Sequence, residues 1–499
     1  MCCRCCSVTQ QKVWVFGLGL LLFIPGVVLV IWWPTWADDI VFGSLPLAPD
    51  SRTFNMWNVT PIPVYMNMYL FNWTNAADVR VPGVKPNFQQ LGPYVFREEK
   101  SKEDVVWHAN KTVTFYVKRQ WFYEPGLSGG SLDDLVTVPH LPSIAASSII
   151  RDQPKIIKFF FNSALNSNGG SLYQTHTAIE WLFDGFYDEF LHYAMSINNS
   201  LTGNIESDHF AFLYQRNGSK EFEGAFTIHT GQGDLHQMGD IKFWKGQNHT
   251  GFYEGDCGRL NGSTADLWVP NRAADEFITI FQSDTCRIIN MVPTSEKFTL
   301  EGIEGVKYET NQDTFDSGDL NPDMKCYCPE NRQPDNCPKS GVTDMGACAD
   351  GAPMYLSHSN FMYADPSFAD TITGMNPNYE RDAFYIIMEP KLGVPLKVNA
   401  AVQVNLHVRS DNDITILRGI PDFYAPVFII ASKAEVNRDL GKQIKFVLNL
   451  PSLGRNIGIG MISLGGILII IGIVLTMTKS WHGQKKILDD MDNKETIHN

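Results

Sequence analysis

The sequence contains no cysteine between Cys6 and Cys257, a gap that divides the ten cysteines of this 499-residue chain into two groups. Charged residues are scarce, at 19%, whereas aromatic residues make up 12%. This balance is typical of a folded protein and argues against disorder. The formal net charge of −14 repels phosphate backbones, which argues against nucleic-acid binding. The chain shows no internal repeat, so solenoids and propellers have no support.

Charge is absent from two apolar runs of 21 residues each, 13–33 and 457–477. Each run is long enough to cross the hydrocarbon core of a bilayer as a helix. A cleaved signal peptide is the alternative for the first run. That run is too long for a typical signal core, and it ends in Trp32, Trp33 and Pro34 rather than at a small-residue cleavage site. We therefore expect two retained transmembrane helices.

The basic residues that flank the runs predict their orientation. Arg4 and Lys12 precede the first run, and Lys479, Lys485 and Lys486 follow the second. Because basic residues concentrate on the cytoplasmic side, both termini are expected inside the cell. The predicted organisation is a cytoplasmic tail at 1–12, an extracellular domain at 34–456 and a cytoplasmic tail at 478–499, separated by the two spans.

Seven N-x-S/T glycosylation acceptors agree with this topology, because all of them lie between the two runs. One such motif means little, but seven on one side of the membrane indicate a secretory-pathway domain. The predicted acceptors are Asn58, Asn72, Asn110, Asn198, Asn217, Asn248 and Asn261.

The two groups of cysteines predict different chemistry. Cys2, Cys3, Cys5 and Cys6 adjoin the first run on its cytoplasmic side, where reduced cysteines are candidates for S-palmitoylation. Six cysteines lie outside, where an oxidising compartment favours three disulfides with 15 possible pairings. A metal site is the alternative, but C-x-C is not the usual zinc knuckle, and we expect no metal. The outer cysteines are Cys257, Cys286, Cys326, Cys328, Cys337 and Cys348.

The segment between the runs is rich in short stretches of β-branched and aromatic residues, separated by Pro, Gly and Asn. This pattern predicts a mixed α+β domain with a large antiparallel sheet. The clearest strand candidates are 112–116, 225–228, 277–281, 383–388 and 401–408.

Helices are expected from Pro154 to Leu165, from Thr177 to about Ala194, and after Ser432. Thr177 and Glu180 have the spacing of a capping box, and so do Ser432 and Glu435. The first two helices carry more apolar residues than one face can hold. Packing between the helices and the sheet explains this load, and a hydrophobic ligand platform is the alternative; from the pattern alone packing is favoured.

A search for an enzyme finds only weak motifs. Residues 126–130 fit G-x-S-x-G around Ser128, but Pro125 before them and Asp133 after them indicate a loop rather than a strand-to-helix elbow. There is no H-E-x-x-H motif and no phosphate-binding loop. We expect no enzymatic activity and no cofactor, and a lipid hydrolase that uses Ser128 is the alternative.

Several motifs resemble the class B scavenger receptor family, which includes the fatty-acid translocase and the lysosomal integral membrane protein. The resemblance covers nearly the whole chain, and the amino-terminal segment 11–17 is similar to insect croquemort-type members. The motifs are Gly92-Pro93-Tyr94, Cys257 followed by Asn261-Gly262-Ser263-Thr264, Cys286-Arg287, Cys326-Tyr327-Cys328, Gly374-Met375-Asn376-Pro377, Glu389-Pro390 and Gln403-Val404-Asn405-Leu406.

The resemblance implies a β-barrel-like extracellular domain with a helical crown, flanked by the two transmembrane helices. It implies the disulfides Cys257–Cys326, Cys286–Cys348 and Cys328–Cys337. It also implies a scavenger or phagocytic receptor that binds apoptotic cells, microbes and lipoproteins and passes lipid through a tunnel. The expected partners are lipids, lipoproteins, anionic phospholipid surfaces and bacterial surfaces.

In this light the apolar helices become the ligand-binding crown, formed by Phe159, Phe160, Trp181, Phe183 and Phe186. The turn at 166–170 lacks the lysines that help the translocase capture anions, so Arg151, Lys155 and Lys158 are the candidate basic residues. A solvated helix face explains these three equally well.

The predicted location is the plasma membrane. A lysosomal enzyme-sorting receptor is one alternative, because the carboxyl-terminal tail holds Ile487-Leu488, but Gly483 replaces the acidic residue expected before such a pair. A lipid or pheromone carrier of sensory neurons is another alternative, and the sequence does not distinguish it from a scavenger receptor of the plasma membrane.

Overall fold

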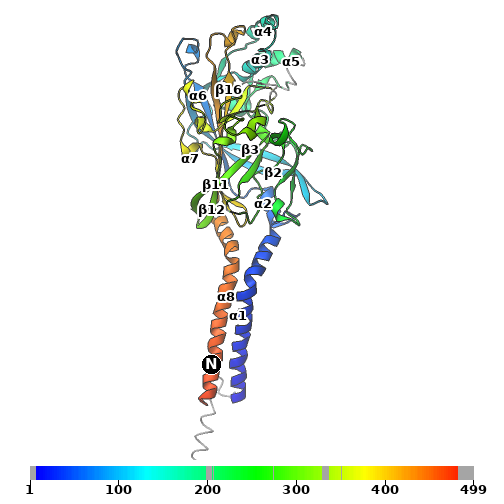
Figure 1. Cartoon of the computed structure of the whole chain (residues 1–499), viewed down its shortest axis with the longest axis vertical. Coiled ribbons are helices and arrows are strands. Elements are labelled where there is room, and N and C mark those ends of the chain that lie inside the picture. Colours follow the sequence, from blue (N-terminus) through cyan, green and yellow to red (C-terminus); the bar gives the residue numbers. More distant parts are fainter. Residues whose placement is uncertain are drawn as a thin grey trace, which may run out of the picture. The chain divides into compact units, whose positions relative to one another are not determined.

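The computed structural model describes residues 7–197, 205, 207–273, 275–328, 337–349 and 351–481. These form two compact units. One unit holds the two long terminal helices, and the other spans Pro46–Asn437 (Figure 1).

The first unit is a pair of helices, α1 (Val8–Ser44) and α8 (Arg438–Met477). Both are long and apolar enough to cross a membrane, as predicted, and they contain the runs 13–33 and 457–477. Each helix extends well beyond its apolar run.

The two terminal helices approach each other through glycines. A Cβ on Gly26 would lie 2.9 Å from the carbonyl oxygen of Gly458, and one on Gly465 would lie 2.6 Å from that of Gly19. The indole of Trp33 donates a hydrogen bond of 2.9 Å to the carbonyl of Leu450. Small residues allow such close backbone contact between membrane helices, where packing takes the place of the hydrophobic effect.

The second unit is built on one large antiparallel sheet, nearly closed into a barrel. Eleven of its strands follow the order β10-β11-β12-β15-β16-β17-β1-β2-β3-β8-β9, and β13 and β14 join at the side of β16. The strands are β1 (Val64–Trp73), β2 (Phe88–Trp107), β3 (Thr112–Tyr123), β8 (Phe226–His229), β9 (Ile241–Trp244), β10 (Ile278–Gln282), β11 (Arg287–Leu300), β12 (Ile303–Glu309), β13 (Val342–Asp344), β14 (Met354–Ser357), β15 (Tyr385–Glu389), β16 (Val394–Val408) and β17 (Phe423–Glu435).

Short helices and two small two-stranded sheets complete this unit, and α3, α4 and α5 gather at one end of it (Figure 1). The fold class predicted from the sequence is therefore confirmed. The helices are α2 (Arg52–Asn58), α3 (Leu141–Ile150), α4 (Lys155–Ser167), α5 (Glu189–Ile197), α6 (Pro366–Asp370) and α7 (Tyr379–Asp382), and the small sheets pair β4 (Leu135–Pro139) with β5 (Tyr173–Thr177) and β6 (Phe186–Tyr187) with β7 (His209–Phe210).

Two of the three expected helices differ from the structure. The capping box of Thr177 and Glu180 forms, but only a short π-helical turn follows it, because the chain reverses at Gly185 with a φ of +75°. Glycine adopts this conformation at little cost. The expected helix that approaches the second span is present as α8, but it begins at Arg438, and the predicted capping box does not form because Ser432 and Glu435 pair in β17.

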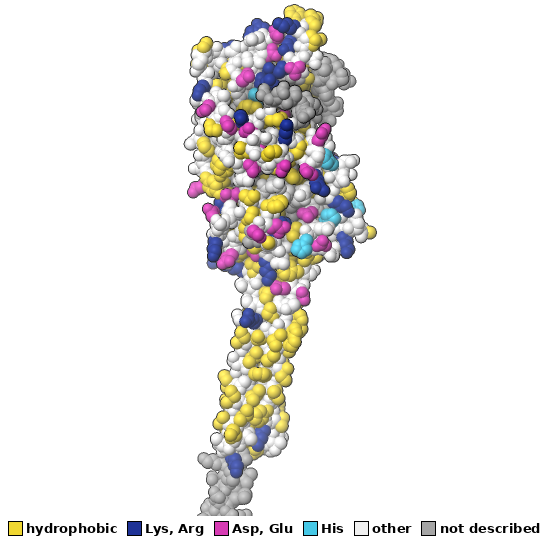
Figure 2. Space-filling model, viewed as in Figure 1, with side chains coloured by type: hydrophobic (Ala, Val, Ile, Leu, Met, Phe, Trp, Pro, Cys, Tyr) yellow, Lys and Arg dark blue, Asp and Glu magenta, His cyan; other side chains and the backbone are white. Residues whose placement is uncertain are grey.

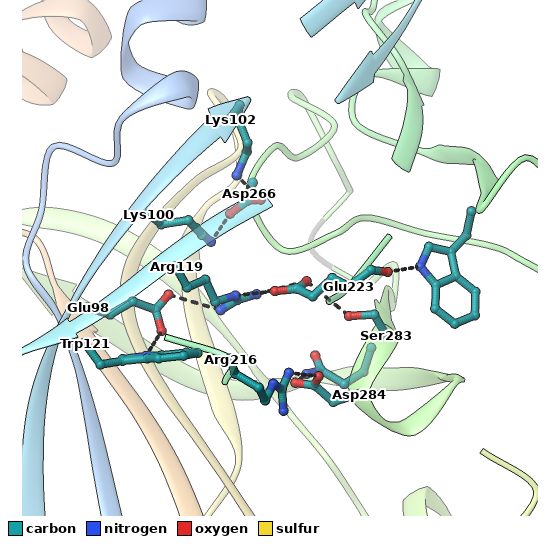
Figure 3. A network of polar contacts seen from close by, with 12 residues as sticks. Glu98, Lys100, Lys102, Arg119, Trp121, Arg216, Glu223, Asp266, Ser283 and Asp284 are labelled. Atoms are coloured by element: carbon teal, nitrogen blue, oxygen red, sulfur yellow. Dashed lines mark hydrogen bonds and ion pairs between the residues drawn. The ribbon is translucent and has the colours of Figure 1, made fainter. Parts of the chain in front are cut away.

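A network of buried ion pairs joins β2 and β3 to the neighbouring loops (Figure 3). Lys100 and Lys102 of β2 both contact Asp266, and the distance from Lys102 Nζ to Asp266 Oδ2 is 2.8 Å. Arg119 of β3 contacts the carboxylates of Glu98 and Glu223. Charges removed from water are tolerated only when they are paired in this way.

Three disulfides lie in the second unit, joining Cys257 to Cys326, Cys286 to Cys348, and Cys328 to Cys337. These are the same pairs that the family resemblance implies. The first two close loops of 69 and 62 residues, so they restrict the unfolded chain over a long span.

Candidate functional site: the helical crown and an apolar sheet face

One side of α4 is fastened to the connection between β16 and β17. The ammonium of Lys158 lies 2.9 Å from a carboxylate oxygen of Asp411. The side-chain amide of Asn162 donates to the carbonyl of Asp413 at 2.7 Å, and its oxygen accepts from the backbone of Thr415. Leu165, one turn further along, is completely buried. Positions i, i+4 and i+7 share one face of a helix, so residues 158, 162 and 165 form the attached side of α4.

The opposite side of α4 is apolar and exposed. Phe159 and Phe160 are 66% and 63% exposed, and Ile156 is 60% exposed. The rings of Phe159 and Phe160 meet edge to face, with their centroids 5.7 Å apart. Hydrophobic side chains gather at the end of the second unit where α4 lies (Figure 1 and Figure 2). An apolar group of this kind at a protein surface indicates a binding site.

The other three aromatic residues predicted for the crown are buried (Trp181 and Phe186) or half-buried (Phe183). Trp181 is completely buried, and its indole donates to the carbonyl of Val136 at 2.9 Å. Phe186 packs on Trp181 and is also buried, and the ring of Phe183 meets that of Phe96 with centroids 4.9 Å apart. These three residues support the crown from within rather than facing a ligand at its surface.

The three basic residues predicted for the crown differ in how accessible they are. The guanidinium of Arg151 donates to the carbonyls of Arg409 and Ser410, and burial lowers its pKa. Lys158 is buried beside Asp411, as described above. Lys155 is 86% exposed, with its ammonium 3.6 Å from Asp413. Of these three residues, only Lys155 therefore has a largely exposed charged side chain.

The sequence search overlooked a buried Ser-His-Asp arrangement beneath α3. His140 Nδ1 lies 2.8 Å from the hydroxyl of Ser143, and its Nε2 lies 2.8 Å from a carboxylate oxygen of Asp188. Burial opposes ionisation of Asp188, but the contact with His140 holds its pKa below the ordinary value. All three side chains are at most 3% exposed, so no substrate reaches the serine. The arrangement joins α3 to the loop before α5.

Ser128, the serine of the weak hydrolase motif, has a structural role. Its hydroxyl donates to the carbonyl of Glu124 and accepts from the backbone amide of Val95. These bonds fasten the 124–130 loop to β2.

The predicted acceptor asparagines occupy varied positions. Asn110, Asn217, Asn248 and Asn261 are exposed, whereas Asn58 and Asn72 are half-buried. Asn198 lies outside the described residues, as do the predicted lipidation sites Cys2, Cys3, Cys5 and Cys6.

Strand β16 carries buried polar residues on one side and half-buried apolar residues on the other, a distribution that the sequence analysis did not predict. In β16 the polar residues Asn399 and Gln403 are at most 3% exposed, whereas the apolar Val398, Ala400 and Val402, which point to the opposite side, are only half-buried. Neighbouring strands continue the apolar face, because residues directly opposite each other point to the same side of a sheet. The continuing residues are Ile386 of β15, Phe428 and Ile430 of β17, and Met66, Met68 and Leu70 of β1.

The polar face of β16 is covered by the segment before β15. The amide of Gln403 accepts from the backbone of Asn360 at 2.7 Å, and Asn405 donates to Ser357 at 3.0 Å. The period-two alternation of β16 therefore predicts two faces correctly, but it does not reveal that residues distant in sequence cover the polar one. The signal in the sequence that could have indicated a buried polar face was the alternation of Asn and Gln side chains with apolar residues along β16.

Two apolar terminal helices and one large disulfide-linked β domain between them define a membrane protein with a single bulky domain. Residues 17–476 match the model of the CD36 family, and the chain belongs to that family. Protein peste of Drosophila melanogaster is 32% identical over 458 residues, which cover 90% of this chain and 80% of that protein. Mouse scavenger receptor class B member 1 is 26% identical over 485 residues (95% and 92%), and mouse lysosome membrane protein 2 is 26% identical over 479 residues (95% of each).

Proposed function

We propose that this chain is a class B scavenger receptor of the cell surface, which captures lipid-bearing particles with its crown and passes lipid along the apolar face of its sheet. The particles are apoptotic cells, microbes and lipoproteins, and the ligands are anionic and apolar lipids. The names of the relatives support a scavenger receptor, and the observation that carries the proposal is the exposed apolar side of α4.

The physical basis of capture is removal of this apolar side from water. Moving a phenylalanine side chain out of water is worth about 1.5–3 kcal/mol, so Phe159 and Phe160 together can supply about 3–6 kcal/mol. Aromatic rings and lysine are also the residues that favour the interface of a bilayer. Phe159, Phe160 and the exposed Lys155 combine these features on the first two turns of α4.

The test is vesicle binding to cells that display the full chain. We expect Phe159→Ser combined with Phe160→Ser to reduce binding of phosphatidylcholine vesicles at least about tenfold, at equal surface display. Phe277→Ser is the matched control, because Phe277 is 54% exposed but lies just before β10 rather than on α4. Equal binding by the wild type and the double variant would overturn capture by α4.

A separate variant tests whether charge contributes to capture. Arg151 and Lys158 support the fold, so only Lys155 can be reversed without breaking buried contacts. One lysine near an anionic surface is worth about 1 kcal/mol. We expect Lys155→Glu to weaken binding to phosphatidylserine vesicles by about fivefold or more and to spare phosphatidylcholine vesicles. Equal losses on both vesicle types would contradict an electrostatic contribution.

Passage of lipid is assigned to the apolar face that includes Val398, Ala400 and Val402. In this proposal a hydrocarbon chain lies against these half-buried side chains and occupies the space next to Ala400. We expect Ala400→Phe to fill this space, so that transfer of a fluorescent sterol into cells falls while vesicle binding stays normal. Ala400→Val is the control. Unchanged transfer by the Ala400→Phe variant would contradict this route.

The proposed topology places both tails in the cytoplasm, the acceptor asparagines outside and palmitate on the amino-terminal cysteines. The proposed location is the plasma membrane, and an enzyme-sorting receptor of the lysosome or a carrier of sensory neurons is the alternative. Surface labelling and imaging of the tagged chain test this. Label confined to lysosomes would favour the sorting receptor.

A further inference from the structure

A polar cleft of about 380 Å³ lies on the side of the sheet that bears the polar residues of β16. Tyr69 of β1 projects to this side, because it pairs with Ile429, which in turn pairs with Gln403. The cleft size is within the usual range for small-ligand sites. Its lining consists of Tyr69, Gln90, Gly92, Pro93, Asn360, Gly374, Asn376 and Arg381.

Three sequence motifs that the proposed function leaves unused meet at this cleft. Gly92-Pro93 of the first motif and Gly374 and Asn376 of the second line it directly. Gln403 of the third lies beneath it, where its side-chain oxygen accepts from the backbone of Asn360. A Cβ on Gly374 would lie 1.8 Å from the carbonyl oxygen of Phe88, so only glycine permits this wall.

The floor of the cleft is fixed by hydrogen bonds. Asn360 is 2% exposed and has a φ of +56°, a conformation that costs energy for a non-glycine residue. Its amide donates to Gln90 at 3.0 Å and to Asp382 at 3.2 Å, and its oxygen accepts from the backbone of Asn376. A buried network with every member satisfied holds its side chains in place. The cleft is therefore preorganised.

The charge within the cleft is balanced. Arg381 donates to both carboxylate oxygens of Asp382, at 2.7 and 2.6 Å, and Asp382 is 1% exposed behind it. The remaining polar side chains of the lining are the carboxamides of Gln90 and Asn376, the internally bonded carboxamide of Asn360 and the phenol of Tyr69. Burial raises the pKa of Tyr69, so it stays a neutral O–H group. Carboxamides both donate and accept, whereas an anion requires donors alone.

We propose that this cleft binds a neutral, hydroxyl-rich ligand, namely a saccharide unit. Hydroxyl groups donate and accept at once, which matches carboxamides and a phenol better than a carboxylate or phosphate does. The side-chain amide of Asn376 has no hydrogen bond to the described part of the chain, so it is free to meet a ligand hydroxyl. The cleft and the apolar lipid route lie on opposite faces of the same strands, which makes this a second site, independent of lipid transfer.

The experiment uses the full chain in lipid nanodiscs free of sugar detergents, after its own N-glycans have been trimmed. Maltose, mannobiose and diacetylchitobiose are the probes, followed by saturation-transfer NMR, with octanoate as a carboxylate probe. We expect at least one disaccharide to bind. Asn376→Leu and Tyr69→Phe should each weaken binding by about fivefold or more, because each removes hydrogen bonds to the ligand. Tyr65→Phe is the control, as Tyr65 lies on the same strand outside the lining.

Binding of a disaccharide that both variants weaken and the control preserves supports the proposal. The proposal is overturned if no disaccharide binds, or if binding is the same in both variants as in the wild type. It is also overturned if octanoate alone binds and the variants weaken it, since the cleft would then be a carboxylate site. Vesicle binding measured on the same variants should be normal, which separates this test from that of the crown.

Discussion

Lys102 is a buried charged residue whose ammonium group is paired with the carboxylate of Asp266. Its side chain is 1% exposed, and burial lowers its pKa to about 8, against the opposing effect of the Asp266 carboxylate. Lys100, 14% exposed, contacts the same carboxylate. Asp266 therefore supplies one counter-charge that two lysines of β2 share, from a loop more than 160 residues away in the sequence.

We predict that Asp266→Asn destabilises the protein by about 3–5 kcal/mol, because two buried ammonium groups lose their counter-charge. The measurement is the midpoint of thermal unfolding, with surface display as a second readout. Glu435→Gln is the control, since the pair of Glu435 with Lys397 is 51% and 33% exposed and should contribute at most about 1 kcal/mol. Similar losses in the two variants would contradict the prediction.

At the scale of elements, glycines determine how closely α1 and α8 pack. Gly458 and Gly465 face α1, where a Cβ would come within 3 Å of its backbone. Gly460 and Gly466, on the same helix, have no neighbour within 4 Å. The helix thus carries two classes of glycine, which the sequence alone does not distinguish.

We predict that Gly458→Leu forces the two helices apart and costs about 1–3 kcal/mol, the usual range for overpacking. Gly460→Leu should be neutral, because its side chain points away from α1. The readout is the temperature at which the protein in nanodiscs loses its fold. A loss for Gly460→Leu as large as that for Gly458→Leu would argue against this packing.

The expected helix from Thr177 to about Ala194 illustrates the limit of local patterns. The capping box forms and the segment is apolar, as the sequence predicts. Gly185 nevertheless ends the turn, and Phe186 pairs with Phe210 in a small two-stranded sheet. A chain segment some 20 residues away supplies that partner, and no local propensity encodes it. The helix of α4 was predicted within two residues at each end, because Pro154 and the glycines at 169–170 bound it locally.

At the scale of the whole molecule, the β domain responds to acid through a buried histidine. His358 is completely buried and accepts or donates one hydrogen bond, to Thr310 at 2.9 Å. Burial lowers its pKa to about 3, below the ordinary value of about 6.5. In an unfolded chain this histidine binds a proton below about pH 6.5, and in the folded chain it does not. The stability it contributes is therefore present above pH 6.5 and is lost as the pH falls toward 3.

We predict that His358 costs the protein about 2 kcal/mol of unfolding free energy between pH 6.5 and pH 5, at 1.36 kcal/mol for each pH unit. The His358→Leu variant should lack this part of the pH dependence, and Thr310 keeps its bond to the carbonyl of Phe384 in that variant. Denaturant unfolding at pH 7 and pH 5 measures the difference. Identical pH dependence in the two proteins would contradict the prediction.

The sequence by itself determined the features that depend on local composition and on neighbours along the chain. Two charge-free runs, the positions of the acceptor asparagines and the separation of the cysteines predicted a two-span membrane protein, and the motifs predicted its family. Strands such as 112–116 and 401–408 followed from β-branched and aromatic residues, which suit a pleated surface wherever it lies in the fold.

Only the tertiary structure decided which side chains meet. It enclosed Trp181 in the crown and left Phe159 in solvent, although both belong to apolar stretches of similar composition. It also covered the polar face of β16 and brought Gly92, Asn360 and Asn376 to one cleft. The physical reason is that burial and polar pairing depend on contacts between segments distant in sequence, and such contacts are set by the closure of the whole sheet.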